Sequence, residues 1–196
     1  NNYDFHNLYK ELLNFCTVDL SAFYFDIRKD TLYCDKINSI KRQSTIIVLN
    51  IILNSLLKWF APILSFTTEE IYKLLEEKNS IHLQQFLNFP QKFKNINLDN
   101  KWKELIKIRN ICNISIEEKR ASKEIGSSLE AEIKINLDNK FEELIKDVDF
   151  SELCITSKAE ISYNQNSETK AETVKAKGSK CPVCWKLSEE PCVRHS

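Results

Sequence analysis

Apolar residues recur every three to four positions over most of the first 120 residues, which is the period of an amphipathic helix. The pattern predicts helices over residues 3–16, 20–33, 40–60, a short stretch from 67, and 99–119. Thr67 and Glu70 fit a capping box at the start of the fourth helix, because the hydroxyl can accept an amide N–H while the carboxylate reaches back. The expected inward residues of the last two helices are Ile71, Leu74, Leu75, Trp102, Leu105, Ile106 and Ile116. Short connections favour an antiparallel bundle.

The pattern changes after Gly126. Ile133, Ile135 and Leu137 alternate with polar residues, and this period of two predicts a half-buried strand. A short helix around residues 141–145 and a second extended stretch over 153–163 follow. The expected organisation is a helical domain over residues 1–120, a small α+β segment over 121–170 and a metal-binding segment over 171–196. The fold class is therefore mainly α.

Composition narrows the choice of function. The 28 basic residues balance the 28 acidic ones, so a nucleic-acid contact must come from a local patch. Only two glycines occur among 196 residues, which argues against a glycine-rich phosphate loop. No methionine is present, so we expect the chain to be a piece of a longer protein; a protein that has lost only its initiator methionine is the alternative.

The longest apolar stretch, over residues 46–57, is interrupted by Asn50, Asn54 and Ser55. It is predicted to be too short and too polar to span a membrane. The seven cysteines indicate reducing surroundings, because four of them are scattered singly at positions where a free cysteine acts as a small hydrophobic residue. We therefore expect a soluble, cytoplasmic protein with no membrane contact.

The strongest local motif lies in the last residues, KCPVCWKLSEEPCVRHS. Cys181 and Cys184 have the spacing of a metal-binding knuckle turn, and Cys192 and His195 repeat it. Together they form a Cys3His set, which binds one structural zinc ion and leaves no open position for catalysis. A segment this small cannot build a hydrophobic core, so metal binding would supply its folding free energy. A redox pair or unpaired thiols are the alternative interpretations.

Two groups of side chains are candidates for RNA binding. The first comprises Arg28, Lys29, Lys41 and Arg42, and the second comprises Lys177, Lys180, Trp185 and Lys186. An indole beside lysines can stack on an unpaired base. The alternative is that the lysines form an ordinary solvated face and that Trp185 packs the knuckle. For catalysis, His6 and His82 have no partner at an interpretable spacing, so no catalytic residue is predicted.

Four runs of residues carry a family resemblance. NFCTVDLSAFYFDIRKDTLYC (14–34), APILSFTTEEIY (61–72), KRASKEIGSSLEA (119–131) and KCPVCW (180–185) resemble, in order and spacing, the C-terminal part of bacterial isoleucyl-tRNA synthetases. The helical runs are shared loosely with valyl- and leucyl-tRNA synthetases, whereas the terminal knuckle points to isoleucine. The family usually has a cysteine at the fourth ligand position, which is His195 here.

The resemblance implies a helical domain that packs along the anticodon stem of tRNA(Ile) and a zinc-binding end that contacts the tRNA around the anticodon. It also implies a parent enzyme, expected to be a monomer, that uses ATP to ligate isoleucine to its tRNA. Its ATP-binding and editing domains would lie outside these residues. A free-standing zinc-ribbon nucleic-acid-binding protein is the alternative, and a helical interaction module is the third possibility.

Overall fold

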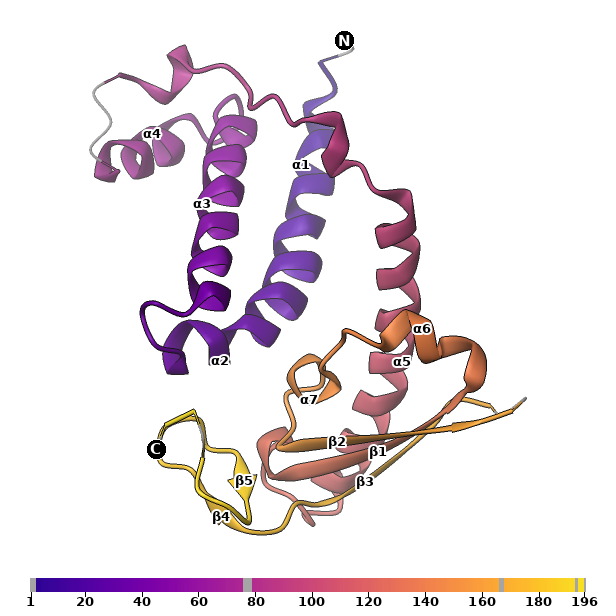
Figure 1. Ribbon diagram of the computed structural model, residues 1–196. Helices are drawn as coiled ribbons and strands as arrows, with labels where there is room; N and C mark the ends of the chain where they lie inside the picture. Colours follow the sequence, from indigo (N-terminus) through magenta and orange to yellow (C-terminus); the bar gives the residue numbers. More distant parts are fainter. Residues whose placement is uncertain (1–2, 76–78, 166–167, 193, 196) are drawn as a thin grey trace. The chain divides into compact units, whose positions relative to one another are not determined.

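A computed structural model describes residues 3–75, 79–165, 168–192 and 194–195. The chain forms two compact units, Asn1–Phe93 and Lys94–Ser196. The first unit is helical, and the second contains a small sheet, a long helix and a terminal ribbon (Figure 1). The prediction of a mainly helical chain that ends in a small α+β region is confirmed.

The first unit begins with one continuous helical stretch. Helix α1 (Phe5–Asn14) runs into a π-helical segment, η1 (Phe15–Phe25), and then into α2 (Asp26–Cys34). The break predicted between residues 16 and 20 is therefore absent, since the wider π-helical turns carry the backbone through it.

Helix α3 (Ile40–Phe60) has the predicted bounds. Ser39 caps its start, where the hydroxyl accepts from the Arg42 amide, and Tyr9 of α1 packs on Phe60, with ring centroids 6.5 Å apart. Because the beginning of α1 meets the end of α3, the two helices are antiparallel, as predicted.

Helix α3 corrects one expectation. It is 21 residues long, and by length and composition alone it is apolar enough to cross a membrane. The helix extends to both sides of residues 46–57, the stretch on which the prediction was based. Core helices of soluble proteins meet the same criterion, so this property by itself does not identify a membrane span.

Helix α4 (Ser65–Leu74) corrects a second expectation, because it begins two residues before Thr67 and has no side-chain cap. The predicted capping box is therefore wrong. Glu69 instead accepts hydrogen bonds from the Ser80 hydroxyl at 2.8 Å and the Ile81 amide at 2.9 Å, which ties the helix to the 3-10 turn Ile81–Leu83. The predicted inward residues Ile71, Leu74 and Leu75 are exposed, and Thr68 and Tyr72 are buried in their place.

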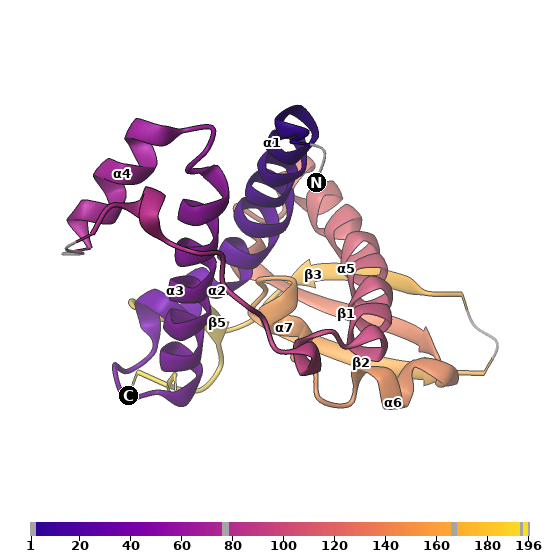
Figure 2. The same cartoon turned by 90° about the horizontal axis from the view of Figure 1, so that it is seen from above.

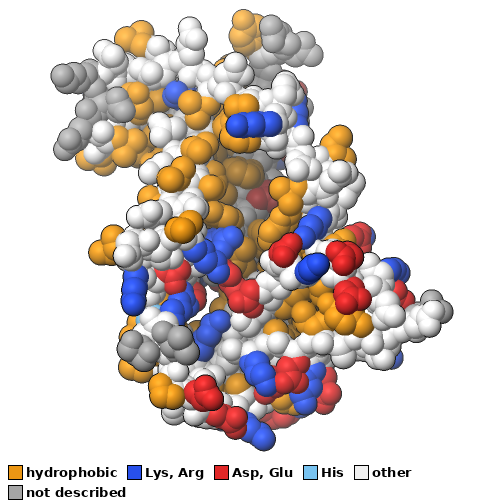
Figure 3. Space-filling view, in the orientation of Figure 1, with side chains coloured by type: hydrophobic (Ala, Val, Ile, Leu, Met, Phe, Trp, Pro, Cys, Tyr) orange, Lys and Arg blue, Asp and Glu red, His pale blue; other side chains and the backbone are white. Residues whose placement is uncertain are grey.

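The first unit contains a buried apolar cluster. Leu57, Ala61, Tyr72 and Ile81 form a buried cluster with Leu53 at its edge. Many large apolar side chains of this unit are exposed, among them Phe5, Tyr9, Ile46, Ile47, Ile51, Phe66 and Leu74. Figure 3 shows apolar side chains gathered over the visible face of these helices.

The second unit is built on a three-stranded sheet. Its strands are β1 (Ala131–Asp138), β2 (Lys158–Asn164) and β3 (Lys170–Lys175), in the order β2-β1-β3. Strand β1 pairs in parallel with β2 and antiparallel with β3. Between β1 and β2 the chain forms the 3-10 turn Asn139–Phe141 and the short helices α6 (Glu142–Ile145) and α7 (Phe150–Leu153). The extended stretch predicted over 153–163 begins later, because α7 occupies its first residue.

Helix α5 (Ile96–Ala121) packs across β3 and β1 (Figure 2). Leu105, Ile108, Cys112 and Ile116 form its buried stripe, while the predicted core residue Ile106 is exposed and Trp102 is half-buried. Because α5 packs on the sheet, the compact helical unit ends at Phe93, whereas the sequence placed the domain boundary at residue 120.

The chain ends in a two-stranded ribbon, which belongs to the second unit. Strands β4 (Ser179–Lys180) and β5 (Leu187–Ser188) pair antiparallel, with Lys180 opposite Leu187. The candidate metal ligands lie in the turn between these strands and in the residues that follow them.

Candidate metal centre and its basic surroundings

Backbone hydrogen bonds shape the turn that carries the first two cysteines. The Cys181 amide donates to the Lys186 carbonyl at 2.9 Å, and the Trp185 amide donates to the Cys181 carbonyl at 3.0 Å. Trp185 has φ 64°, a left-handed conformation that reverses the chain directly after Cys184. The turn therefore brings the two thiols of the first knuckle to the same side.

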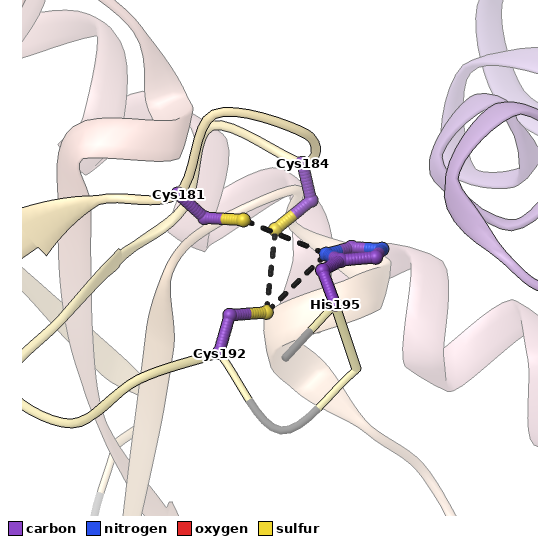
Figure 4. Close-up of side chains that lie close together, drawn as sticks. All are labelled: Cys181, Cys184, Cys192 and His195. Atoms are coloured by element: carbon purple, nitrogen blue, oxygen red, sulfur yellow. Dashed lines mark hydrogen bonds between the residues drawn. The ribbon is translucent and has the colours of Figure 1, made fainter.

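The structure brings the four predicted ligands together (Figure 4). The three Sγ atoms and the His195 ring offer ligand atoms that all lie within 4.8 Å of one another. Cys181 and Cys184 are buried, whereas Cys192 and His195 are half-buried. No other group of three or more such side chains occurs within the part of the chain that the structure describes.

The separations match those of a tetrahedral zinc site. Zinc–sulfur bonds of about 2.3 Å and zinc–nitrogen bonds of about 2.0 Å place sulfurs about 3.8 Å apart and sulfur about 3.5 Å from nitrogen. In the structure, Cys184 Sγ lies 4.0 Å from Cys192 Sγ. His195 Nδ1 lies 3.5 Å from Cys181 Sγ and 3.3 Å from Cys192 Sγ. The cluster can hold one metal ion.

The electrostatics of the cysteines favour a cation. Backbone amides of Cys184 and Val183 lower the pKa of the Cys181 thiol to about 6, so this ligand ionises readily. Burial raises the pKa of the Cys184 thiol to about 11, because the thiolate loses its hydration, and the neighbouring Cys181 and Cys192 thiols raise it further. A divalent cation bound between the thiolates would remove that penalty.

The basic and aromatic residues predicted at this end lie in the ribbon or just before it. The Trp185 side chain is 58% exposed, and Lys180 Nζ lies 5.3 Å from the centre of its ring. Lys177 is exposed and Lys186 is half-buried. Trp185 therefore does not pack the inside of the knuckle, and its ring is accessible to a ligand.

Lys186 lies near Asp149, which precedes α7. Burial alone would raise the pKa of Asp149, but hydrogen bonds from Ser151 and the Glu152 amide lower it overall, with a smaller contribution from Lys186. No sequence signal marked Asp149, because the electrostatic effect of Lys186 on it depends on the fold of the whole unit.

The other predicted RNA-binding residues belong to the first unit and have contacts of their own. Arg42 donates to the Asp35 carbonyl at 2.8 Å and so closes the α2–α3 turn. Lys29 pairs with Asp26 at 3.1 Å, and Arg28 lies over the Tyr24 ring at 5.9 Å. Lys41 is exposed on the first turn of α3. All four lie on α2 or the start of α3.

Comparison with protein families gives one match, to the family described as the anticodon-binding domain of tRNA ligase. The match covers residues 1–135, and therefore runs from the helical unit through α5 into strand β1. It spans more than half of the chain, so the likeness does not rest on a short motif.

Similarity to curated proteins extends over nearly the whole chain. An isoleucine–tRNA ligase of Pelagibacter ubique is 65% identical over 195 residues, which are 99% of this chain and 22% of that protein. The isoleucine–tRNA ligase of Agrobacterium fabrum is 36% identical over 96% of this chain and 21% of its own length. That of Methylacidiphilum infernorum is 38% identical over 95% of this chain. The chain spans about a fifth of the length of these relatives.

Proposed function

Because the chain belongs to the family of anticodon-binding domains of tRNA ligases, we propose that it is the tRNA-binding C-terminal part of a bacterial isoleucyl-tRNA synthetase. Its ligand would be the anticodon stem-loop of tRNA(Ile). The observation that carries this proposal is similarity to isoleucine–tRNA ligases along 99% of the chain, which includes the terminal ribbon as well as the helices.

The role we propose for the ribbon is contact with unpaired bases. Single-stranded bases are bound by stacking on exposed aromatic rings, with cationic side chains that hold the phosphates. Trp185 offers such a ring, and Lys177 and Lys180 are exposed near it in the chain. Arg28, Lys29, Lys41 and Arg42 are proposed to contact the backbone of the tRNA from the first unit.

We propose that the metal ion is zinc and that its role is structural. Three thiolates and one imidazole are a common tetrahedral zinc set, and four protein ligands leave no position for a reacting water. The separations of the ligand atoms agree with this geometry.

The remaining properties belong to the proposed parent enzyme. It would ligate isoleucine to tRNA(Ile) with ATP, in domains outside these residues, and this part would bind no ATP and supply no catalytic residue. We further propose that the enzyme is a cytoplasmic monomer without membrane contact.

Substitution of Trp185 in the intact synthetase tests the proposal. Loss of one stacked base costs about 1–3 kcal/mol, so Trp185→Ala should weaken tRNA(Ile) binding roughly 5- to 150-fold. ATP–pyrophosphate exchange with isoleucine should stay unchanged, because that reaction needs no tRNA. Filter binding, charging and exchange rates of the same preparations give the three measurements.

Lys140→Ala is a matched control, because Lys140 also lies over an aromatic ring, that of Phe141 at 5.1 Å, but in the turn after β1. It should leave tRNA binding unaffected. Normal charging by Trp185→Ala would contradict a role of the ribbon in tRNA binding. Equally tight binding of tRNA(Val) would contradict the assignment to isoleucine.

A further inference from the structure

A short linker joins the ribbon to the sheet. Between the end of β3 and the start of β4 lie Ala176, Lys177 and Gly178. The Ala176 amide donates to the Glu130 carbonyl at 2.8 Å, so the sheet holds the chain firmly up to that residue. Beyond Ala176 the linker by itself does not fix the orientation of the ribbon, so a fixed orientation requires a further contact with the sheet.

Ser157, directly before β2, provides a second attachment. Its hydroxyl accepts from the Leu187 amide of β5 at 2.6 Å and donates to the Leu129 carbonyl just before β1. These roles follow from chemistry, because an amide N–H can only donate, a carbonyl can only accept, and a hydroxyl has one hydrogen with two lone pairs. One side chain therefore joins the ribbon to the edge of the sheet.

The backbone of Ser157 is itself immobilised. Its amide donates to the Ala131 carbonyl at 2.9 Å, at the first residue of β1. The preceding residue, Thr156, is fully buried, and its amide donates to the Ser151 carbonyl at 2.8 Å. The backbone at Ser157 is thus fixed by hydrogen bonds to the sheet and to α7, while its side chain contacts the ribbon. A positioning residue requires such a fixed backbone.

The hydrogen bond between Leu187 and Ser157 lies close in the chain to both Trp185 and the metal-binding turn. Leu187 is two residues after Trp185 and directly follows Lys186, whose carbonyl accepts from the Cys181 amide. The hydrogen bonds of Ser157 go to Leu129, Ala131 and Leu187, none of which is a candidate metal ligand or Trp185. A change of this hydroxyl can therefore alter the orientation of the ribbon while leaving the metal cluster intact.

We propose that Ser157 is a positioning residue that fixes the zinc ribbon on the sheet, so that Trp185 is oriented for the base it stacks on. The inference rests on the proposed function, since it assumes that Trp185 contacts RNA. The hydrogen bond restricts rotation of the ribbon before the tRNA arrives, and less ordering is then needed on binding.

The test uses Ser157→Ala in the intact, zinc-loaded synthetase. Loss of one hydrogen bond should speed hydrogen exchange of the Leu187 amide and weaken tRNA(Ile) binding, each roughly three- to tenfold. The zinc content should remain one ion per chain. Ser157→Thr keeps the hydroxyl and should restore both values. Ser162→Ala is the matched control, because the hydroxyl of Ser162 contacts the Ile135 carbonyl of β1 and not the ribbon.

A double substitution separates positioning from general destabilisation. If Ser157 acts through Trp185, then Ser157→Ala combined with Trp185→Ala should bind tRNA no more weakly than Trp185→Ala alone, because the two losses are one effect. Fully additive losses would overturn the proposal, and so would loss of zinc or unchanged exchange at Leu187 in Ser157→Ala.

The failure of this inference can be distinguished from the failure of the proposed function. If Trp185→Ala binds tRNA normally, the proposed RNA contact of the ribbon is wrong, whatever Ser157 does. If Trp185→Ala binds weakly and Ser157→Ala binds normally, the RNA contact stands and the positioning role is wrong.

Discussion

The sheet and the ribbon of the second unit lie next to each other in the chain but are stabilised in different ways. In β1, Ala131, Ile133, Ile135 and Leu137 are at most 1% exposed and form one apolar row beneath α5. Among the described residues of the ribbon, the buried ones are Cys181 and Cys184, which are two of the four candidate metal ligands. The sheet has a hydrophobic core, whereas the ribbon depends on its ligand set.

This difference predicts that a substitution or the removal of metal can destabilise one of the two parts without destabilising the other. Burial of apolar area stabilises the sheet whether or not metal is present. The ribbon gains its folding free energy from metal binding, since a segment of this size buries little apolar surface. Substitutions that distinguish these two sources of stability test the comparison directly.

The largest effect is expected from loss of a metal ligand. Structural zinc contributes on the order of 10 kcal/mol to the folding of such a segment, so Cys184→Ser should bind no stoichiometric zinc and leave the ribbon unfolded. Metal analysis of the purified protein and hydrogen exchange at Leu187 measure this. Amides of β1 should stay protected, and unfolding of the sheet together with the ribbon would contradict the comparison.

His195→Ala tests the fourth ligand in the same assay. If His195 closes the site, as its distances to Cys181 and Cys192 indicate, the zinc content should fall in this variant too. An unchanged zinc content would mean that water or another group completes the coordination.

The converse experiment removes part of the sheet core. Ile135 is 1% exposed, and truncation of a buried isoleucine costs about 2–5 kcal/mol, so Ile135→Ala should lower the free energy of unfolding of the sheet by that amount. Urea denaturation measures it. Lys134→Ala, at the neighbouring exposed position of β1, is the control and should change stability little. Equal losses in the two variants would mean that the row is not the core.

A smaller effect is expected at the glycine that begins the ribbon. Gly178 has φ 103°, and a Cβ atom there would lie 2.0 Å from the Ser188 carbonyl oxygen of β5. Gly178→Ala should therefore strain the ribbon by roughly 1–3 kcal/mol and weaken zinc binding about tenfold. Competition with a chelator measures the affinity.

Gly126→Ala is the matched control for that substitution. At Gly126 an added Cβ meets nothing closer than the Glu130 carboxylate at 3.5 Å, which is an ordinary contact. Zinc affinity should be unchanged there. A similar loss in both variants would show that the close packing of Gly178 against β5 is unimportant.

Sequence alone predicted those features that depend on near neighbours in the chain. The alternation at Ile133, Ile135 and Leu137 identified β1, because one strand face is buried under a helix. The spacing of the two knuckles identified all four residues of the metal cluster, since the ligands of each knuckle are three positions apart. Helix α3 was predicted with correct bounds for the same local reason.

Features that depend on distant partners were missed. Strand β3 carries no apolar alternation, because its fully buried residue is Thr173, whose hydroxyl bonds to that of Ser115 on α5 at 2.9 Å. Ser157 carried no signal either, since its partners Leu129 and Leu187 lie 28 and 30 residues away. Assignment of α5 to the sheet likewise required the fold itself.

The smallest effect is expected at another left-handed residue, Lys123, which belongs to the sheet region. Lys123 has φ 60° and follows the end of α5, where its amide donates to the Arg120 carbonyl and that of Glu124 donates to the Lys119 carbonyl. This is the pattern of a Schellman cap, which favours glycine at the position of Lys123. Lys123→Gly should therefore raise the free energy of unfolding by about 0.5–1 kcal/mol, because relief of the left-handed strain exceeds the entropic cost of glycine.

Substitutions at Gly178 and Lys123 give opposite results if the comparison holds. In the ribbon, glycine at 178 is required because the backbone of β5 lies against it, whereas at 123 the side chain is exposed and only the backbone angle matters. Urea denaturation of Lys123→Gly, with Ser122→Gly as the control at the right-handed neighbouring residue, should show stabilisation in the first variant and destabilisation in the second. If Lys123→Gly is the less stable of the two variants, the strain assigned to Lys123 is wrong. The hydrophobic core of the sheet would then not be offsetting an unfavourable residue at the end of α5.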